Sequence, residues 1–213
     1  MATPSSEGRK TLNPSGFTRR SNNMARKIIV VPDSEDDEVV VNRGTGAGGA
    51  GTNKTGLTYE ARTDLVTNYS VVKTAASFKI IKFAGSDKLF TTTSKAGLFK
   101  TIAPSPNVVK AHGCKQPDEC YIDYGKRTIF ILEKKFQQCS GSVCEKIQTA
   151  DFKRRHYRKT FPDYKVEYFY CLSDWYKGNC VAELEYLEEI GIPVFWGSDA
   201  DYKKNVTDFM LNY

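Results

Sequence analysis

The stretch "QPDECYIDYGKRTIFILEKK", residues 116–135, places two short apolar runs on either side of a glycine. Such a pattern predicts a β-hairpin with strands at about 119–124 and 127–135. The second strand is apolar as far as Leu132 and then meets Glu133 and two lysines. A hairpin that ends in adjacent acid and base suggests that its open end has a chemical role.

The turn of this hairpin sets which residues face each other. Gly125 at the first loop position favours a two-residue type II′ turn, in which Tyr124 pairs with Arg127. The numbers of paired residues then sum to 251. Asp118 therefore lies opposite Glu133, with Cβ atoms about 4.5–5.5 Å apart.

Lys135 lies two residues beyond Glu133 and projects from the same face. Asp123, a rival acid in the hairpin, is five residues from the position facing Glu133, so it points to the other face. Facing carboxylates repel each other, and a divalent cation offsets that repulsion. Oxygen ligands without a nearby His or Cys suit Mg²⁺ or Mn²⁺. The alternative is a surface hairpin whose charges are only solvated.

These residues resemble a known signature. Pro117-Asp118, fourteen residues and then Glu133-Lys134-Lys135 are similar to the PD-(D/E)XK nuclease motif, most closely in its type II restriction endonuclease branch. Pro-Asp also occurs at 32–33 and 162–163, but only the pair at 117–118 precedes an apolar strand ending in E-x-K. The segments "GAGGAGTNKTGLTYEART" and "FQQCSGSVCEKIQT" add to the resemblance, which covers roughly residues 48 to 200.

The resemblance implies a Mg²⁺-dependent endonuclease, with Mn²⁺ able to substitute, that hydrolyses double-stranded DNA to 5′-phosphate and 3′-hydroxyl ends. It implies an α/β fold with a mixed central β-sheet flanked by helices. Asp118, Glu133 and the backbone carbonyl of Lys134 would hold the metal, Lys135 would be the catalytic lysine, and Glu60 would complete the site. It implies no other cofactor. Gln137 and Gln138 are at positions where related nucleases contact DNA.

A basic run follows the motif. The segment from residue 142 to 161 predicts a long helix, and its cationic residues are candidates for phosphate contacts that position DNA without reading its sequence. These residues are Lys146, Lys153, Arg154, Arg155 and Arg158. The formal net charge of +6 is compatible with a nucleic-acid partner. Charge alone fits a solvated helix face equally well.

The chain divides by composition into two parts. Residues 1–54 are rich in Ser, Asn, Thr, Gly and charge and predict a flexible tail, whereas 55–213 predict the nuclease domain. The patterns within the domain predict the order α-β-β-β-α-β-α-β-α. Besides the hairpin and the basic helix, we expect helices at 56–72, 179–191 and 202–212 and strands at 78–83, 166–173 and 192–197. The region 85–114 is expected to be irregular, apart from a short helix or strand near 88–93.

Composition also indicates the localisation, the state of the cysteines and the place of the aromatic residues. No segment has a signal-peptide core or the length of a membrane span, so we expect an intracellular protein. The resemblance to restriction endonucleases implies the cytoplasm of a bacterium or of a virus-infected host cell. The six cysteines match neither zinc pairs nor a dense disulfide framework and are expected to be reduced thiols. Trp175, Trp196 and three tyrosines, Tyr168, Tyr170 and Tyr176, are expected in the core rather than as base-stacking platforms.

Several functions remain open at this point. The first is a type II restriction enzyme that cuts a short specific sequence, expected as a homodimer because a duplex needs two cuts, with a cognate DNA methyltransferase as a functional and not a physical partner. The others are a structure-specific repair or recombination nuclease, a non-catalytic DNA-binding protein of the same fold, and a nucleotide-binding module. The last rests on "GGAGTNKT", which departs from a Walker A loop because Asn53 stands where glycine is needed.

Overall fold

The computed structural model describes residues 50–109, 116–138 and 144–213, with side chains from residue 55 onward. The strands are β1 (Tyr69–Thr74), β2 (Lys79–Phe83), β3 (Leu89–Thr93), β4 (Glu119–Asp123), β5 (Thr128–Lys135), β6 (Lys165–Leu172) and β7 (Val194–Trp196). The helices are α1 (Ala50–Arg62), α2 (Gly97–Thr101), α3 (Cys144–Gln148), α4 (Ala150–Thr160), α5 (Trp175–Asn179), α6 (Val181–Glu189) and α7 (Tyr202–Asn212), with a 3₁₀ turn, η1, at Val66–Asn68.

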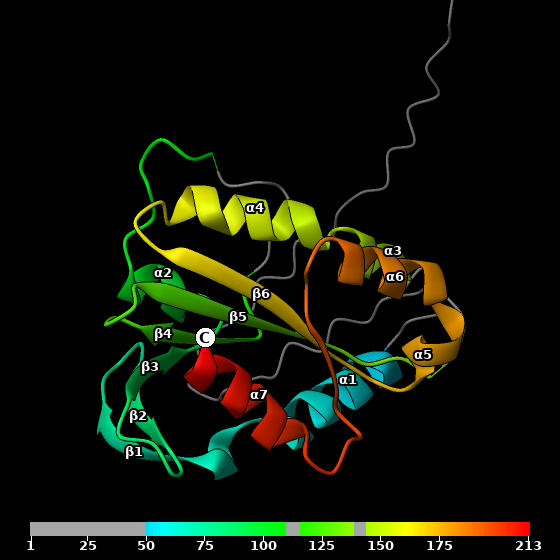
Figure 1. The fold of residues 1–213 in the computed structure, drawn as a ribbon, viewed down its shortest axis with the longest axis horizontal. Coiled ribbons are helices and arrows are strands. Elements are labelled where there is room, and N and C mark those ends of the chain that lie inside the picture. Colours follow the sequence, from blue (N-terminus) through cyan, green and yellow to red (C-terminus); the bar gives the residue numbers. More distant parts are fainter. Residues whose placement is uncertain (1–49, 110–115, 139–143) are drawn as a thin grey trace, which may run out of the picture. The chain divides into compact units, whose positions relative to one another are not determined.

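One sheet holds the seven described strands in the order of the sequence (Figure 1). Neighbouring strands are antiparallel from β1 to β5, whereas the pairs β5–β6 and β6–β7 are parallel. A parallel pair needs a crossover connection, and α3 and α4 lie in the one that joins β5 to β6. The expected fold class, a mixed central sheet flanked by helices, is confirmed.

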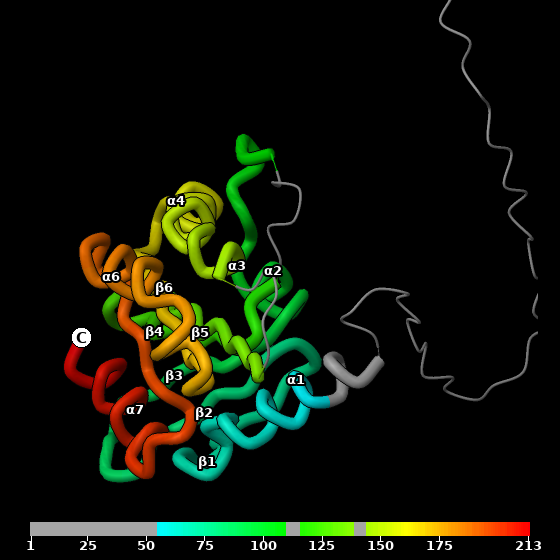
Figure 2. Tube along the Cα trace, turned by 90° about the vertical axis from the view of Figure 1, so that its right-hand side faces the viewer, coloured from blue at the N-terminus to red at the C-terminus, as the bar shows by residue number. Residues whose placement is uncertain are grey.

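Strand β5 separates two hydrophobic clusters, because its side chains alternate between the two faces of the sheet. Ile129 and Ile131 belong to the cluster that includes residues of α4 and α6. Phe130 and Leu132 belong to the other, which includes residues of α1 and α7. Figures 1 and 2 show these helix pairs on opposite sides of β5 and β6. By the same alternation Glu133 and Lys135 continue the α4 face, and Lys134 continues the α1 face.

Two expectations about the first elements are wrong. Helix α1 begins at Ala50, so residues 50–54 of the predicted tail are helical, whereas 1–49 lie outside the described residues. Because residues 50–55 are helical, they also do not form a phosphate-binding loop. The chain leaves the helix at Arg62, and Tyr69–Thr74 forms edge strand β1 instead of continuing a helix to 72. Val and Thr residues in this segment favour a strand.

Later elements agree more closely. The expected strands at 166–173 and 192–197 and the helices at 179–191 and 202–212 correspond to β6, β7, α6 and α7. The basic helix is divided at Thr149 into α3 and α4. Strand β3 agrees with the short element expected near 88–93, whereas helix α2 lies in chain expected to be irregular and α5 was not expected. None of the helices in the described ranges is long and apolar enough to cross a membrane.

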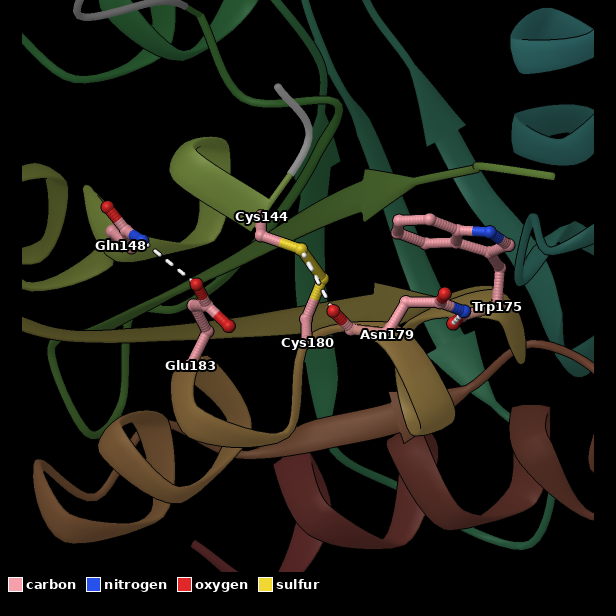
Figure 3. The surroundings of a disulfide bond; sticks show 6 residues. All are labelled: Cys144, Gln148, Trp175, Asn179, Cys180 and Glu183. Carbon is pink, nitrogen blue, oxygen red and sulfur yellow. Dashed lines mark hydrogen bonds between the residues drawn. A yellow bond between two sulfur atoms is a disulfide. The ribbon is translucent and has the colours of Figure 1, made fainter. Parts of the chain in front are cut away.

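The cysteines divide into two classes. Cys120 and Cys171 are free and buried, as expected. Cys144 at the start of α3 forms a disulfide with Cys180 before α6, so the prediction of reduced thiols is wrong for this pair (Figure 3). The two are 36 residues apart in sequence, and spacing alone does not show that two helices will bring them together. Cys114 and Cys139 lie outside the described residues.

Candidate active site

The hairpin has the predicted register. Glu119 pairs with Leu132 and Asp123 with Thr128, so paired numbers sum to 251 as expected. The next position outward sets Asp118 against Glu133. Asp118 also accepts a hydrogen bond of 2.8 Å at Oδ2 from the backbone N–H of Lys134. The hairpin therefore brings the two acids of the motif to one end of the sheet.

The turn type, however, was predicted wrongly. The positive φ of 51° belongs to Arg127 and not to Gly125. Four residues separate the last strand pair, and Arg127 N–H donates to Tyr124 O over 3.3 Å. The carboxylate of Asp123 accepts from Lys126 N–H at 3.0 Å, which stabilises this loop. The register is unchanged, because the predicted two-residue loop and the observed four-residue loop give the same pairing of residues along the two strands.

Three oxygen atoms converge on the ammonium group of Lys135. Glu133 Oε1 is 2.8 Å from Nζ, the Lys134 carbonyl oxygen 2.9 Å and Asp118 Oδ2 3.4 Å. Both carboxylate oxygens contact the same Nζ atom, so the distance between them is at most the sum of these two contacts, 2.8 Å and 3.4 Å. Burial lowers the pKa of Lys135, but Glu133 and Asp118 outweigh it and the pKa is raised. Lys135 is an ammonium ion in this arrangement.

Glu133 is the most enclosed acid of this group, with 7% of its side chain exposed. Its Oε1 atom also lies 3.1 Å from Nζ of Lys153, on α4. Burial raises the pKa of Glu133, but the positive charges of Lys135 and Lys153 outweigh it and hold the pKa below its ordinary value. Glu133 is therefore ionised although it lies in the interior.

The residues that converge on Lys135 fit a divalent cation. Asp118, Glu133 and the Lys134 carbonyl are the three metal ligands suggested by the motif, and they already surround one positive charge. All are oxygen donors, which Mg²⁺ prefers. The Mg²⁺–oxygen distance is about 2.0–2.1 Å, so a bound ion would draw these oxygens closer than the ammonium does. The ammonium of Lys135 would then have to move aside.

Glu60 reaches the same region from α1. Burial, and then the nearby charge of Asp118, raise the pKa of Glu60, while Lys135 and Lys95 act in the opposite direction. Its carboxyl group is therefore within electrostatic range of the site. In the described ranges the one trio of Cys, His, Asp or Glu ligand atoms within 4.8 Å of one another is Cys144, Cys180 and Glu183. Glu60, Asp118 and Glu133 are thus more widely spaced than this, and in the trio the two sulfur atoms are bonded to each other.

Lys134 has a bracing contact that the sequence did not reveal. Its ammonium group, on the α1 face of the sheet, donates to the carboxylate of Glu119 and, over 2.8 Å, to the carbonyl oxygen of Glu60. Tyr121 donates to the other oxygen of Glu119 at 2.7 Å. This contact fixes α1 against β4 and thereby positions Glu60. The sequence did contain one indication of this contact. Glu119 and Lys134 each lie one residue from a motif acid, so both side chains point to the opposite face of the sheet.

The predicted DNA contacts are spread over different places. Lys153 lies in the site, Gln138 is exposed just beyond β5, and the backbone N–H of Gln137 donates to Ser173 Oγ at 3.0 Å. Lys146 and Arg155 are exposed. Arg154 is mostly buried and donates to Ile190 O at 2.8 Å and to Asp151 at 2.9 Å. Arg158 donates to Val166 O at the opposite end of β6. Arg154 is therefore used within the fold, and Arg158 lies away from the acids.

Aromatic residues line the buried side of the site. Tyr168 and Tyr170 on β6 are core residues, as is Tyr176, and Trp175 and Trp196 pack against the same cluster, as expected. Burial, followed by the charge of Glu133, raises the pKa of Tyr168 well above its ordinary value. Tyr168 and Tyr170 therefore remain neutral within electrostatic range of Glu133.

Comparisons of the chain with protein-family models, with curated proteins and with solved structures give no match.

Proposed function

We propose that this protein is a Mg²⁺-dependent endonuclease that hydrolyses phosphodiester bonds of double-stranded DNA, as type II restriction enzymes do. The observation that supports this most directly is the convergence of Asp118 Oδ2, Glu133 Oε1 and the Lys134 carbonyl oxygen on one partly buried positive charge. A non-catalytic DNA-binding protein has no need for two acids held together in this way, because burying charged groups costs stability.

Each residue has a defined task in this proposal. Asp118, Glu133 and the Lys134 carbonyl would hold Mg²⁺, with Glu60 at the margin of the site. When bound, the ion lowers the pKa of a coordinated water and stabilises charge on a phosphoryl oxygen. Lys135, released from the carboxylates, donates a hydrogen bond to the attacking water or to a phosphoryl oxygen and stabilises the charge that develops there.

The reaction balances as a hydrolysis. The water oxygen forms a bond to phosphorus and the bond from phosphorus to the 3′ oxygen breaks. The water loses a proton and the leaving oxygen gains one, which produces 5′-phosphate and 3′-hydroxyl ends. No covalent intermediate with the protein is needed.

The proposed function also implies an oligomeric state, a functional partner and a place of action. A restriction enzyme would act as a homodimer, because one centre cuts one strand, and would work beside a DNA methyltransferase that protects the host sequence. Its place of action would be the cytoplasm of a bacterium or of a virus-infected cell. Analytical ultracentrifugation with and without a DNA duplex tests the dimer.

Plasmid cleavage tests the activity. We expect supercoiled plasmid to be linearised in Mg²⁺ and left intact in EDTA, and Glu133→Gln to remove cleavage while the protein still binds DNA. Glu185→Gln, which changes an exposed acid on α6, is the matched control. Full cleavage by Glu133→Gln, or cleavage in EDTA, would contradict the proposal.

The pattern of cuts distinguishes the remaining nuclease function. Discrete fragments with a common terminal sequence support a restriction enzyme. Cleavage confined to branched junctions or to DNA ends would instead assign a repair or recombination enzyme with the same chemistry.

A further inference from the structure

Lys153 is the feature that the proposed reaction leaves without a task. It lies on α4, eighteen residues beyond Lys135 in the numbering, and is not part of the motif. Its ammonium group nevertheless lies 3.1 Å from Glu133 Oε1, the same atom that Lys135 contacts at 2.8 Å. With 16% of its side chain exposed, it is more enclosed than a lysine on a solvated helix face.

The helix that carries Lys153 is well anchored. Arg154, the next residue, donates to Ile190 O at the end of α6 and to Asp151 within α4. Tyr157, one turn further on, is buried in the core cluster. The backbone of Lys153 is therefore held in place, and its long side chain can move without moving the helix.

The acids at this end of the sheet already have cationic partners. Lys135 contacts both Asp118 and Glu133, and Lys153 contacts Glu133. A divalent cation placed between the acids would lie beside two ammonium groups that contact one of its ligand oxygens, and like charges at this range repel. The ammonium groups must therefore leave Glu133 when the ion binds. A DNA phosphate arriving at the same place supplies the negative charge that they lose.

We propose that Lys153 is a second cationic residue of the reacting centre. Before metal binds, it neutralises Glu133; once metal and DNA are bound, its ammonium group contacts the phosphate that is cut. This inference rests on the proposed nuclease function. It differs from a DNA contact elsewhere on α4, because it predicts that Lys153 competes with the metal ion for Glu133.

The competition gives two effects of opposite sign. Lys153→Met keeps most of the side-chain length and removes the charge. We expect it to bind Mn²⁺ several-fold more tightly than the wild type in the absence of DNA, measured by calorimetry, and to cut DNA roughly 10²-fold more slowly in single turnovers at saturating Mg²⁺. Lys153→Arg should restore most of the rate. A purely structural ion pair would instead weaken both metal binding and cleavage when Lys153 is removed.

Lys204→Met is the matched control, because it removes an ion pair with Asp208 on α7. It should change neither quantity. If Lys153→Met also changes neither, or weakens Mn²⁺ binding, the role of Lys153 is wrong although the nuclease proposal stands. If the wild type neither binds Mn²⁺ nor cuts DNA, the nuclease proposal itself fails.

A second measurement uses the wild-type protein and does not depend on folding of a variant. Amine acylation followed by mass spectrometry reports how accessible each lysine is. We expect Lys153 to react faster in Ca²⁺ than in EDTA, because it leaves Glu133, and to become protected when a DNA duplex is added. A reactivity that is unchanged by Ca²⁺ would contradict the inference.

Discussion

Lys134 and Lys135 are adjacent in sequence but serve opposite faces of the sheet. The ammonium of Lys134 contacts Glu119 and the backbone of α1, and 2% of its side chain is exposed. The ammonium of Lys135 contacts Glu133 and Asp118, and 21% is exposed. Both are lysines beside buried acids. The first ion pair is enclosed and braces the fold, whereas the second opens towards solvent, where a metal ion and a phosphate can replace the lysine.

Removing Lys135 should produce the largest effect. We expect Lys135→Met to slow single-turnover cleavage by roughly 10²–10³-fold, because a donor to the developing charge is lost. The same rate measured for Lys204→Met should match the wild type. A Lys135→Met protein with more than about a tenth of the wild-type rate would show that the two lysines do not differ in function.

The disulfide affects one face of the sheet. It joins α3 to the start of α6, and both helices pack on the side of Glu133 and Lys153. We expect Cys144→Ser/Cys180→Ser to lower the free energy of unfolding by about 3–4 kcal/mol, from the entropy of an open chain of 36 residues. Urea denaturation in oxidising and reducing buffer provides the measurement.

The wild type in reducing buffer is the control for that pair of substitutions. It should unfold like the double variant, and the double variant should not respond to reductant. A wild type that is equally stable in both buffers would contradict a stabilising disulfide.

Removing Lys134 should lower the stability of the fold. Lys134→Met leaves Glu119 without its charged partner, and breaking a buried ion pair costs about 3 kcal/mol. Urea denaturation measures the loss. If Lys134→Met is as stable as the wild type and loses only its activity, the bracing role is wrong.

The smallest effect is a difference in pH dependence between the two faces. Burial raises the pKa of Glu119 and Lys134 only partly offsets it, whereas Lys135 and Lys153 hold the pKa of Glu133 below its ordinary value despite burial. The stability that Glu133 contributes is complete above its unfolded pKa of about 4.5 and is lost as pH falls through the folded pKa. For Glu119 the contribution is complete below about 4.5 and is lost as pH rises through the folded pKa.

Two isosteric variants measure this difference. The destabilisation caused by Glu133→Gln should shrink as pH falls, and that caused by Glu119→Gln should shrink as pH rises. Unfolding free energies from about pH 3 to about pH 7 give both slopes. Slopes of the same sign would remove the distinction between the two acids.

The accuracy of the sequence-based predictions follows from the range of the interactions involved. The sequence predicted that Asp118 faces Glu133, because side-chain alternation and a short loop determine this pairing. The prediction was correct although the turn type at Gly125 was wrong. The contact of Lys153 with Glu133 was not, because it depends on how α4 packs across β6. The disulfide between Cys144 and Cys180 depends in the same way on how α3 and α6 pack together.

The central claim is that Asp118, Glu133 and the Lys134 carbonyl hold a divalent cation in place of the Lys135 ammonium. Anomalous diffraction from crystals grown with Mn²⁺ tests it directly. We predict one strong peak within about 2.2 Å of those three oxygens, with Lys135 Nζ moved away from Glu133. The absence of a peak there, with Lys135 still bonded to Glu133, would contradict the account.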